Sequence, residues 1–263
     1  MKQSPNRMSR MLCAGLLAVA ATGFAPVKAQ TVLERSAETR FQIDFRVPDA
    51  VLARLLPAGW EPNIATSGAA KDANLRLIVI DRLTVSGADG KPLPGAGGRL
   101  AWLAIPVKKQ GATDVGQMIV AGLTDAASEV PGVPGTVRLA VRTDMRRTSI
   151  TRAGGEVQTE EHWLFEAADG EHVEIDARFE RAPAMRSAST VRFHSAINPD
   201  VFQVFRIDMG IDIMRNATLP IRDRVSEFRY RVGGGRLAPL FDGSERVLSI
   251  DAFPWYDRTT VTP

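Results

Sequence analysis

Two adjacent lysines, Lys108 and Lys109, are the residues whose type and spacing most readily allow covalent chemistry. Beyond residue 29 the chain has only two other lysines, Lys71 and Lys91. Neighbouring ammonium groups repel, which favours the neutral amine of one of them. A neutral amine can attack a carbonyl carbon and form a Schiff base that acts as an electron sink. The same pair also fits a solvated strand end, and both interpretations stay open.

Metal chemistry receives less support from the residue types. The chain has three histidines: His162, His172 and His194. None belongs to a helical HExxH pair, although His172 and Glu174 share one side of a predicted strand. Zinc usually needs three or four convergent ligands. We therefore expect the histidines of a charged hairpin, His162 and His172, to be surface residues, and we expect no metal site and no cofactor.

Nucleophilic and nucleotide-binding motifs are missing after residue 29. That part of the sequence has no GxSxG elbow and no SxxK motif. The only cysteine, Cys13, lies in the first 29 residues. The glycine-rich stretch Gly95–Gly98 lacks the strand–GxGxxG–helix context of a dinucleotide site. The mature chain would therefore have no thiolate catalysis and no disulfide.

The first 29 residues have the layout of a secretory signal peptide. A basic start that contains Lys2, Arg7 and Arg10 precedes an apolar run from Met11 to Ala21. Small residues then stand at the −3 and −1 positions of a cleavage site after Ala29. An uncleaved anchor is the alternative, although the apolar run is short for a membrane span. We expect a signal peptide over 1–29 and a periplasmic mature domain over 30–263.

The charge balance of the mature chain excludes a general basic surface. The leader contains four of the 33 basic residues and no acidic one, which leaves 29 basic against 30 acidic residues. Nucleic-acid binding needs a clustered basic face. No second long apolar run follows the leader. We expect neither nucleic acid nor, after signal cleavage, a membrane as partner.

Periodicity predicts a mainly β, largely antiparallel fold in one domain with few short helices. Phe41–Phe45 alternates as a half-buried strand does, and the polar residues 30–40 before it are expected to be a poorly ordered lead-in. A short helix is expected between Pro48 and Pro57. Residues 112–128 fit either a helix or a strand. Further strands are expected at 75–80, 99–107, 137–141, 157–165, 171–179 and 205–213.

The strand expected at 205–213 has the clearest alternation in the chain. Its odd-numbered residues are apolar, and three of the residues between them are Arg206, Asp208 and Asp212. The charged side is either a solvated face or the lining of a cavity. Many such strands with few helices are typical of a curved sheet or a barrel.

The segment from Phe41 to Pro57, followed by Gly59-Trp60-Glu61-Pro62, resembles the amino-terminal segment of the acetoacetate decarboxylase family. In that family a strand that ends in an arginine precedes a short helix and a Leu-Leu-Pro stop. The segment Arg236–Asp242 is similar to the family's carboxy-terminal R-L-x-L-F-D segment. The resemblance touches most of residues 38–252. It implies an antiparallel, cone-like β-barrel that encloses a small-molecule cavity, often in a homo-oligomer.

The resemblance implies catalytic roles that depend on the alignment. The family's Schiff-base lysine lies in a Pro-Lys-Lys sequence. A direct match of the lysines makes Lys108 the nucleophile and Lys109 its neighbour. A match of strand order instead places Pro131-Gly132-Val133 at Pro-Lys-Lys, so that the lysine is missing. We favour the second register because it needs fewer deletions.

The resemblance also places candidate binding residues near the family's active site. Arg40 and Arg46 lie in the segment that would supply a substrate-binding arginine, and Glu129 lies near the candidate turn as a proton donor. The implied function is a periplasmic carbon–carbon lyase of the decarboxylase type. Its substrate would be a small keto acid or an aromatic or unsaturated carboxylic acid. The alternative is a binding protein for a small carboxylate or carbonyl compound that has the same cavity but no catalysis.

Overall fold

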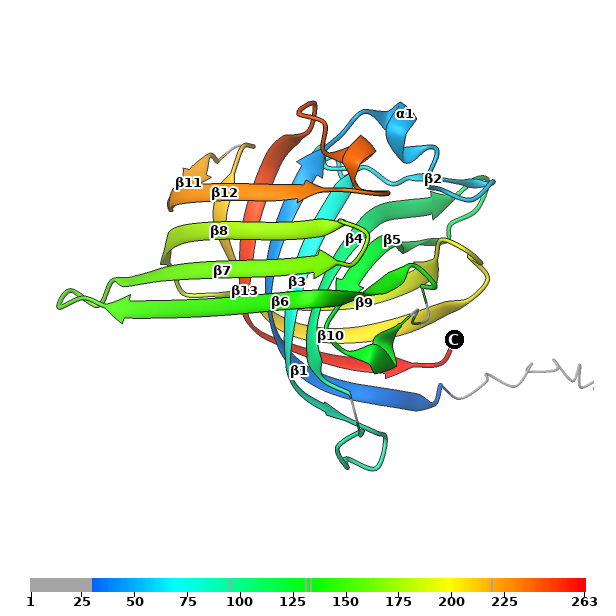
Figure 1. Cartoon of the computed structure of the whole chain (residues 1–263), viewed down its shortest axis with the longest axis horizontal. Helices are drawn as coiled ribbons and strands as arrows, with labels where there is room; N and C mark the ends of the chain where they lie inside the picture. Colours follow the sequence, from blue (N-terminus) through cyan, green and yellow to red (C-terminus); the bar gives the residue numbers. More distant parts are fainter. Residues whose placement is uncertain (1–29, 95, 131, 133, 219) are drawn as a thin grey trace, which may run out of the picture.

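The computed structural model describes residues 30–263 apart from Gly95, Pro131, Val133 and Leu219 (Figure 1). The predicted leader over 1–29 therefore lies outside the described residues, as do two residues of the favoured register, Pro131 and Val133. The described strands are β1 (Val32–Arg46), β2 (Trp60–Pro62), β3 (Leu75–Ser86), β4 (Gly98–Lys109), β5 (Val115–Thr124), β6 (Val137–Thr151), β7 (Val157–Ala167), β8 (His172–Arg181), β9 (Met185–Ser195), β10 (Phe202–Asn216), β11 (Arg222–Asp223), β12 (Val225–Gly233) and β13 (Arg246–Val261). The described helices are short: α1 (Asp49–Leu52), η1 (Ala127–Glu129) and η2 (Ala238–Leu240).

Seven of these strands form a closed ring in the order β4-β5-β9-β10-β13-β1-β3. The ring closes because β5 pairs with strands on both sides. It is antiparallel to β4 and parallel to β9, where Gln117–Ile119 lie beside Phe193–Ser195. Closure leaves these strands without free edges.

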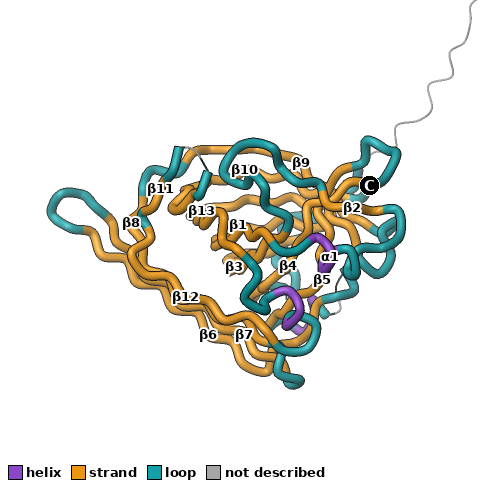
Figure 2. Tube along the Cα trace, turned by 90° about the horizontal axis from the view of Figure 1, so that it is seen from above, coloured by secondary structure: helices purple, strands orange, loops and turns teal. Residues whose placement is uncertain are grey.

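A second sheet, β6-β7-β8-β12, branches from the same strand β5. The last residues of β5, Gly122–Thr124, pair in parallel with Val137–Leu139 of β6. Figure 2 shows this sheet running along one side of the ring. The larger apolar core includes Phe41 and Phe45 of β1 together with Trp163 and Phe179 of the second sheet. Burial of this shared core therefore holds the sheet against the outside of the ring.

The predicted mainly β class with few short helices is confirmed. The helix expected between Pro48 and Pro57 is reduced to the four residues of α1. The ambiguous segment 112–128 contains strand β5. Among the described residues, no helix has the length and hydropathy needed to cross a membrane.

Residues 30–40 differ from the expected loose lead-in. Strand β1 begins at Val32 and is paired with both β13 and β3. The polar pattern was misleading because Glu38 and Arg40 are buried and paired with each other inside the ring. Their charges are compensated by the protein and not by water.

Candidate functional site

The interior of the ring contains a cavity of about 410 Å³. Side chains alternate along a strand, so Arg40, Gln42 and Asp44 of β1 line this cavity. Phe41 and Ile43 point the other way, into the core shared with the second sheet. Apolar side chains form much of the remaining wall: Ile78, Val191, Phe193, Ile207, Met209, Ile211, Ile213 and Phe253. An apolar cavity with a few polar groups is the usual form of a small-molecule site.

Two carboxyl groups, Asp44 and Asp251, lie together in the cavity wall. Asp251 pairs with Gln42 across β1 and β13, two residues along β1 from Asp44 and therefore on the same face of the sheet. Burial and the nearby charge of Asp44 raise the pKa of Asp251 to about 8. Burial also raises the pKa of Asp44, but the guanidinium of Arg76, 2.9 Å away, opposes this effect. We place the shared proton on Asp251, because Asp44 has the adjacent cation.

The hydrogen bonds of Ser249 are compatible with this proton position, although donation from Ser249 to a charged Asp251 would lower the pKa of Asp251 and oppose the effect of burial. The Ser249 hydroxyl lies 3.1 Å from the carbonyl oxygen of Arg215 and 2.8 Å from Oδ1 of Asp251. A hydroxyl has one proton to donate, and the carbonyl can only accept. If Ser249 donates to Arg215, the hydrogen bond to Asp251 requires a proton on Asp251. In that arrangement a neutral Asp251 donates to Ser249, and Ser249 donates to the carbonyl of Arg215.

A buried ion-pair network supplies the cation of the cavity. Oε2 of Glu38 accepts a hydrogen bond of 2.7 Å from Nε of Arg40, and Oε1 accepts one of 3.0 Å from Nε of Arg258. Despite its burial, these cations and the Ser36 hydroxyl lower the pKa of Glu38 to about 2. The guanidinium of Arg40 also lies 3.5 Å from the ring centre of Tyr256.

Two buried polar atoms at this cavity have no hydrogen-bond partner among the described residues. They are Oε1 of Gln117, an acceptor, and Nη2 of Arg40, a donor that forms no hydrogen bond although it lies 2.5 Å from Oε2 of Glu38 as an ion pair. Buried polar groups are rarely left unpaired without a reason. A ligand with an anionic oxygen and a hydroxyl or amine would satisfy both atoms.

A second, smaller cavity of about 170 Å³ also lies within the ring and shares the side chain of Phe193 with the first. Glu129 lines it, and its carboxylate is 3.0 Å from Nη1 of Arg82. Gly132, the middle residue of the favoured register, lines the same cavity. Of the three residues of that register, Gly132 alone belongs to the described part of the chain, and the register stays a prediction.

The predicted site residues are separated by the fold. Arg40 and Glu129 reach the two cavities. Lys108 and Lys109 lie at the exposed end of β4, where the amine of Lys108 is 3.0 Å from Glu61. Arg46 binds Asp49 at 2.8 Å at the end of β1. Among the described residues that line the two cavities, none is a lysine; the catalytic roles of Lys108 and Lys109 stay predictions.

Sequence reasoning missed Asp44 and Asp251. The signal was present in the two alternating segments that contain them, Phe41–Phe45 and Ser249–Phe253, each with polar residues between apolar ones. Such a pattern fits a solvated face as well as a polar cavity wall. Only the closure of the ring distinguishes the two.

The sequence matches no family model and no curated protein. Solved structures do share its fold. The enduracididine biosynthesis enzyme MppR complexed with pyruvate is 14% identical, with a TM-score of 0.52 over 89% of this chain and 90% of that one. An acetoacetate decarboxylase-like enzyme from Sphingomonas wittichii RW1 is 15% identical, with a TM-score of 0.51 over 92% and 96%. The acetoacetate decarboxylase from Legionella pneumophila is 12% identical, with a TM-score of 0.52 over 96% and 98%.

These comparisons define the class by its fold. The ring and the second sheet together form the acetoacetate decarboxylase-like fold, and the resemblance inferred from Phe41–Pro57 is confirmed at this level. The solved structures with this fold include a decarboxylase and an enzyme complexed with pyruvate.

The protonation of Asp251 predicts a specific pH dependence of stability. The folded pKa of about 8 lies above the ordinary value of 3.8, so the folded state binds the proton more tightly. The free energy of unfolding should therefore fall as the pH rises from about 4 to about 8. In Asp251→Asn the amide can still donate a hydrogen bond to Ser249, and the part of this loss that is due to Asp251 should disappear, so that only the smaller part due to the raised pKa of Asp44 remains. Denaturant titrations at several pH values measure the difference.

The matched control is Asp257→Asn, at an exposed position on the same strand. It should keep the pH dependence of the unmodified protein. Equal pH profiles for the Asp251→Asn variant and the unmodified protein would contradict a proton on Asp251.

Proposed function

We propose that the protein is a carbon–carbon lyase of the decarboxylase type. Its substrate is a small keto acid or an aromatic or unsaturated carboxylic acid bound inside the ring. The observation that carries the proposal is the presence, in one cavity, of the guanidinium of Arg40, whose Nη2 is ion-paired with Glu38 but forms no hydrogen bond, and of the carboxyl of Asp251, whose pKa burial raises to about 8. The fold it shares with an acetoacetate decarboxylase supports the same reaction class.

The proposed reaction needs only groups that line this cavity. Arg40 binds the substrate carboxylate through a charge-assisted hydrogen bond. When the carbon–carbon bond breaks, CO2 leaves and the bonding electron pair stays on the substrate carbon, delocalised into the adjacent carbonyl or double bond. Asp251 donates its proton to that carbon and is reprotonated from water. A general acid of this kind needs a pKa near the working pH, which burial gives Asp251.

A binding protein with the same cavity is the second candidate. It is favoured by the cavity walls, which contain no lysine among the described residues. Native mass spectrometry after incubation with a panel of small keto acids and unsaturated acids distinguishes the two functions. An enzyme should release the decarboxylated product, whereas a binding protein should retain unaltered ligand.

Arg40 and Asp251 should affect different kinetic constants for a substrate found in this panel. Arg40→Lys keeps a positive charge beside Glu38 but loses the planar fork, so KM should rise roughly tenfold. The amide of Asp251→Asn can donate a hydrogen bond but cannot transfer a proton to the substrate carbon, so kcat should fall about 10²- to 10⁴-fold. Arg46→Lys, on the same strand but outside the cavity, is the control and should leave both constants unchanged. If Arg46→Lys and Arg40→Lys behave alike, the carboxylate is not bound by Arg40.

The amine mechanism is tested directly with the two lysines. Lys108→Ala and Lys109→Ala should retain full turnover, because both side chains lie outside the cavities and the Lys108 amine is bound to Glu61. Borohydride reduction in the presence of the keto acids should leave no adduct on either residue by peptide mapping. A reduced carbonyl adduct on Lys108 or Lys109 would instead establish Schiff-base catalysis and the direct lysine register.

Export to the periplasm is part of the proposal and rests on the layout of residues 1–29. The mature protein should appear in the periplasmic fraction of a bacterial host, and its intact mass should correspond to a chain that begins at Gln30. Full-length protein held in the membrane fraction would indicate an uncleaved anchor. Self-association into a homo-oligomer stays a prediction of the resemblance.

A further inference from the structure

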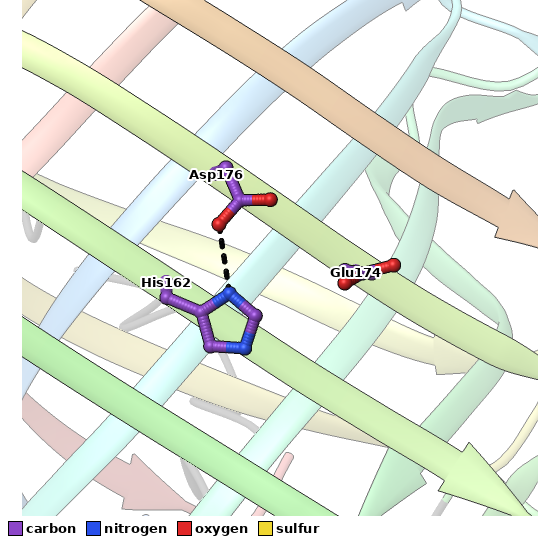
Figure 3. Close-up of side chains that lie close together, drawn as sticks. All are labelled: His162, Glu174 and Asp176. Atoms are coloured by element: carbon purple, nitrogen blue, oxygen red, sulfur yellow. Dashed lines mark hydrogen bonds and ion pairs between the residues drawn. The ribbon is translucent and has the colours of Figure 1, made fainter.

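The outer face of the second sheet has a cluster of side chains of the types that bind metal ions. None of these side chains lines the ring cavities. His162 on β7 and Glu174 and Asp176 on β8 point to the same side of the sheet (Figure 3). Their neighbours Trp163 and Ile175 are fully buried in the core on the other side. The cluster therefore faces away from the ring.

The strand register holds the three side chains together. His162 is directly opposite Asp176 in the β7–β8 pair, and Glu174 pairs with Leu164, one diagonal step away. Residues opposite or diagonal to each other on one face of a sheet are within side-chain reach. One ligand atom from each of the three residues lies within 4.8 Å of the other two.

A fourth group completes the surroundings of the imidazole. Nδ1 of His162 is 2.8 Å from Oδ1 of Asp176, and Nε2 is 4.0 Å from a carboxylate oxygen of Asp144 on β6. Both ring nitrogens thus face carboxylates. In metal sites, the nitrogen of a ligating histidine that does not bind the ion usually donates its N–H to such a group.

Two arginines reduce the negative charge of the cluster. Arg231 lies 3.3 Å from Glu174, and Arg146 lies 3.4 Å from Asp144. Their side chains are 75% and 71% exposed. Exposed ion pairs of this kind contribute little free energy, so a more strongly bound cation can displace them.

We propose that His162, Glu174 and Asp176 bind a divalent transition-metal ion, with Zn²⁺ the best match. Imidazole nitrogen and carboxylate oxygen are ordinary zinc ligands. The ion takes a place between Nδ1 of His162 and the carboxylate of Asp176, where it binds the Nδ1 lone pair. The neutral imidazole then has its one proton on Nε2, which faces the carboxylate of Asp144 at 4.0 Å. Water completes the coordination of the ion.

The site is independent of the proposed lyase activity. It uses no residue of the ring cavities and lies on the opposite face of the second sheet from the core. A bound ion would link β7 to β8 at their centres and stabilise the folded state by mass action.

Calorimetric titration of Zn²⁺ into the purified, untagged protein tests the site. One ion should bind per chain. His162→Ala should weaken the affinity more than about 100-fold, because even the loss of a group that only orients a ligand typically costs 10- to 100-fold. Asp144→Asn should weaken the affinity for Zn²⁺ by the smaller factor, about 10- to 100-fold. His172→Ala, which removes a histidine at the start of the same strand β8, should bind as the unmodified protein does.

Replacement of Arg231 is a further test, because the expected result is tighter binding of Zn²⁺, which an unfolded variant would not give. Arg231→Ala frees the carboxylate of Glu174 and should tighten Zn²⁺ binding several-fold. Circular dichroism confirms that each variant is folded. Absence of zinc binding in the unmodified protein would overturn the proposal. So would an unchanged affinity in His162→Ala, or a loss of binding in His172→Ala.

Discussion

The carboxylate of Glu38 is the charge on which the interior of the ring depends. An isolated carboxylate at this depth would cost several kcal/mol. Its position is favourable only because Arg40 from the same strand and Arg258 from β13 both bind it, together with Ser36. Arg258 lies opposite Ser36 in the β1–β13 pair, so one anion holds the inner faces of two strands in register. The same anion orients Arg40 over Tyr256 and so fixes the cation that reaches the cavity.

Strand β1 also shows which parts of the structure were accessible from sequence. Its alternation predicted a strand correctly, because Phe41, Ile43 and Phe45 bury one face. The alternation did not show the environment of the opposite face, where Arg40 and Asp44 face the interior of a closed ring. An alternation of apolar and polar residues separates the two faces of a strand. It does not show whether the polar face is exposed to solvent or enclosed by other strands. The contacts that decide it are remote: Asp44 meets Arg76, and Ser249 meets the carbonyl of Arg215.

The candidate site was predictable to the extent that it depends on the amino-terminal segment. Arg40 was identified through a resemblance whose most specific part is that segment, and it lies in the cavity wall. The adjacency of Lys108 and Lys109 was a genuine chemical signal, but adjacency does not specify location, and the end of β4 lies outside the cavities. The fold is shared with solved structures at 12–15% identity. A shared fold does not determine the chemistry of the site, so the cavity's own side chains must carry the functional argument.

Those side chains favour a reaction in which an anion becomes neutral. Each cation at the cavity already has a carboxylate partner: Arg76 has Asp44, and Arg40 has Glu38. Asp251 adds no charge while it is protonated. In the proposed reaction, a substrate carboxylate therefore enters a nearly neutral site with apolar walls, where both cations are already paired with carboxylates and compensate only in part for lost water. An anion is costly in such surroundings, and loss of CO2 disperses its charge into the substrate carbon framework. The proton on Asp251 then removes that charge, so desolvation and protonation act in the same direction without an amine.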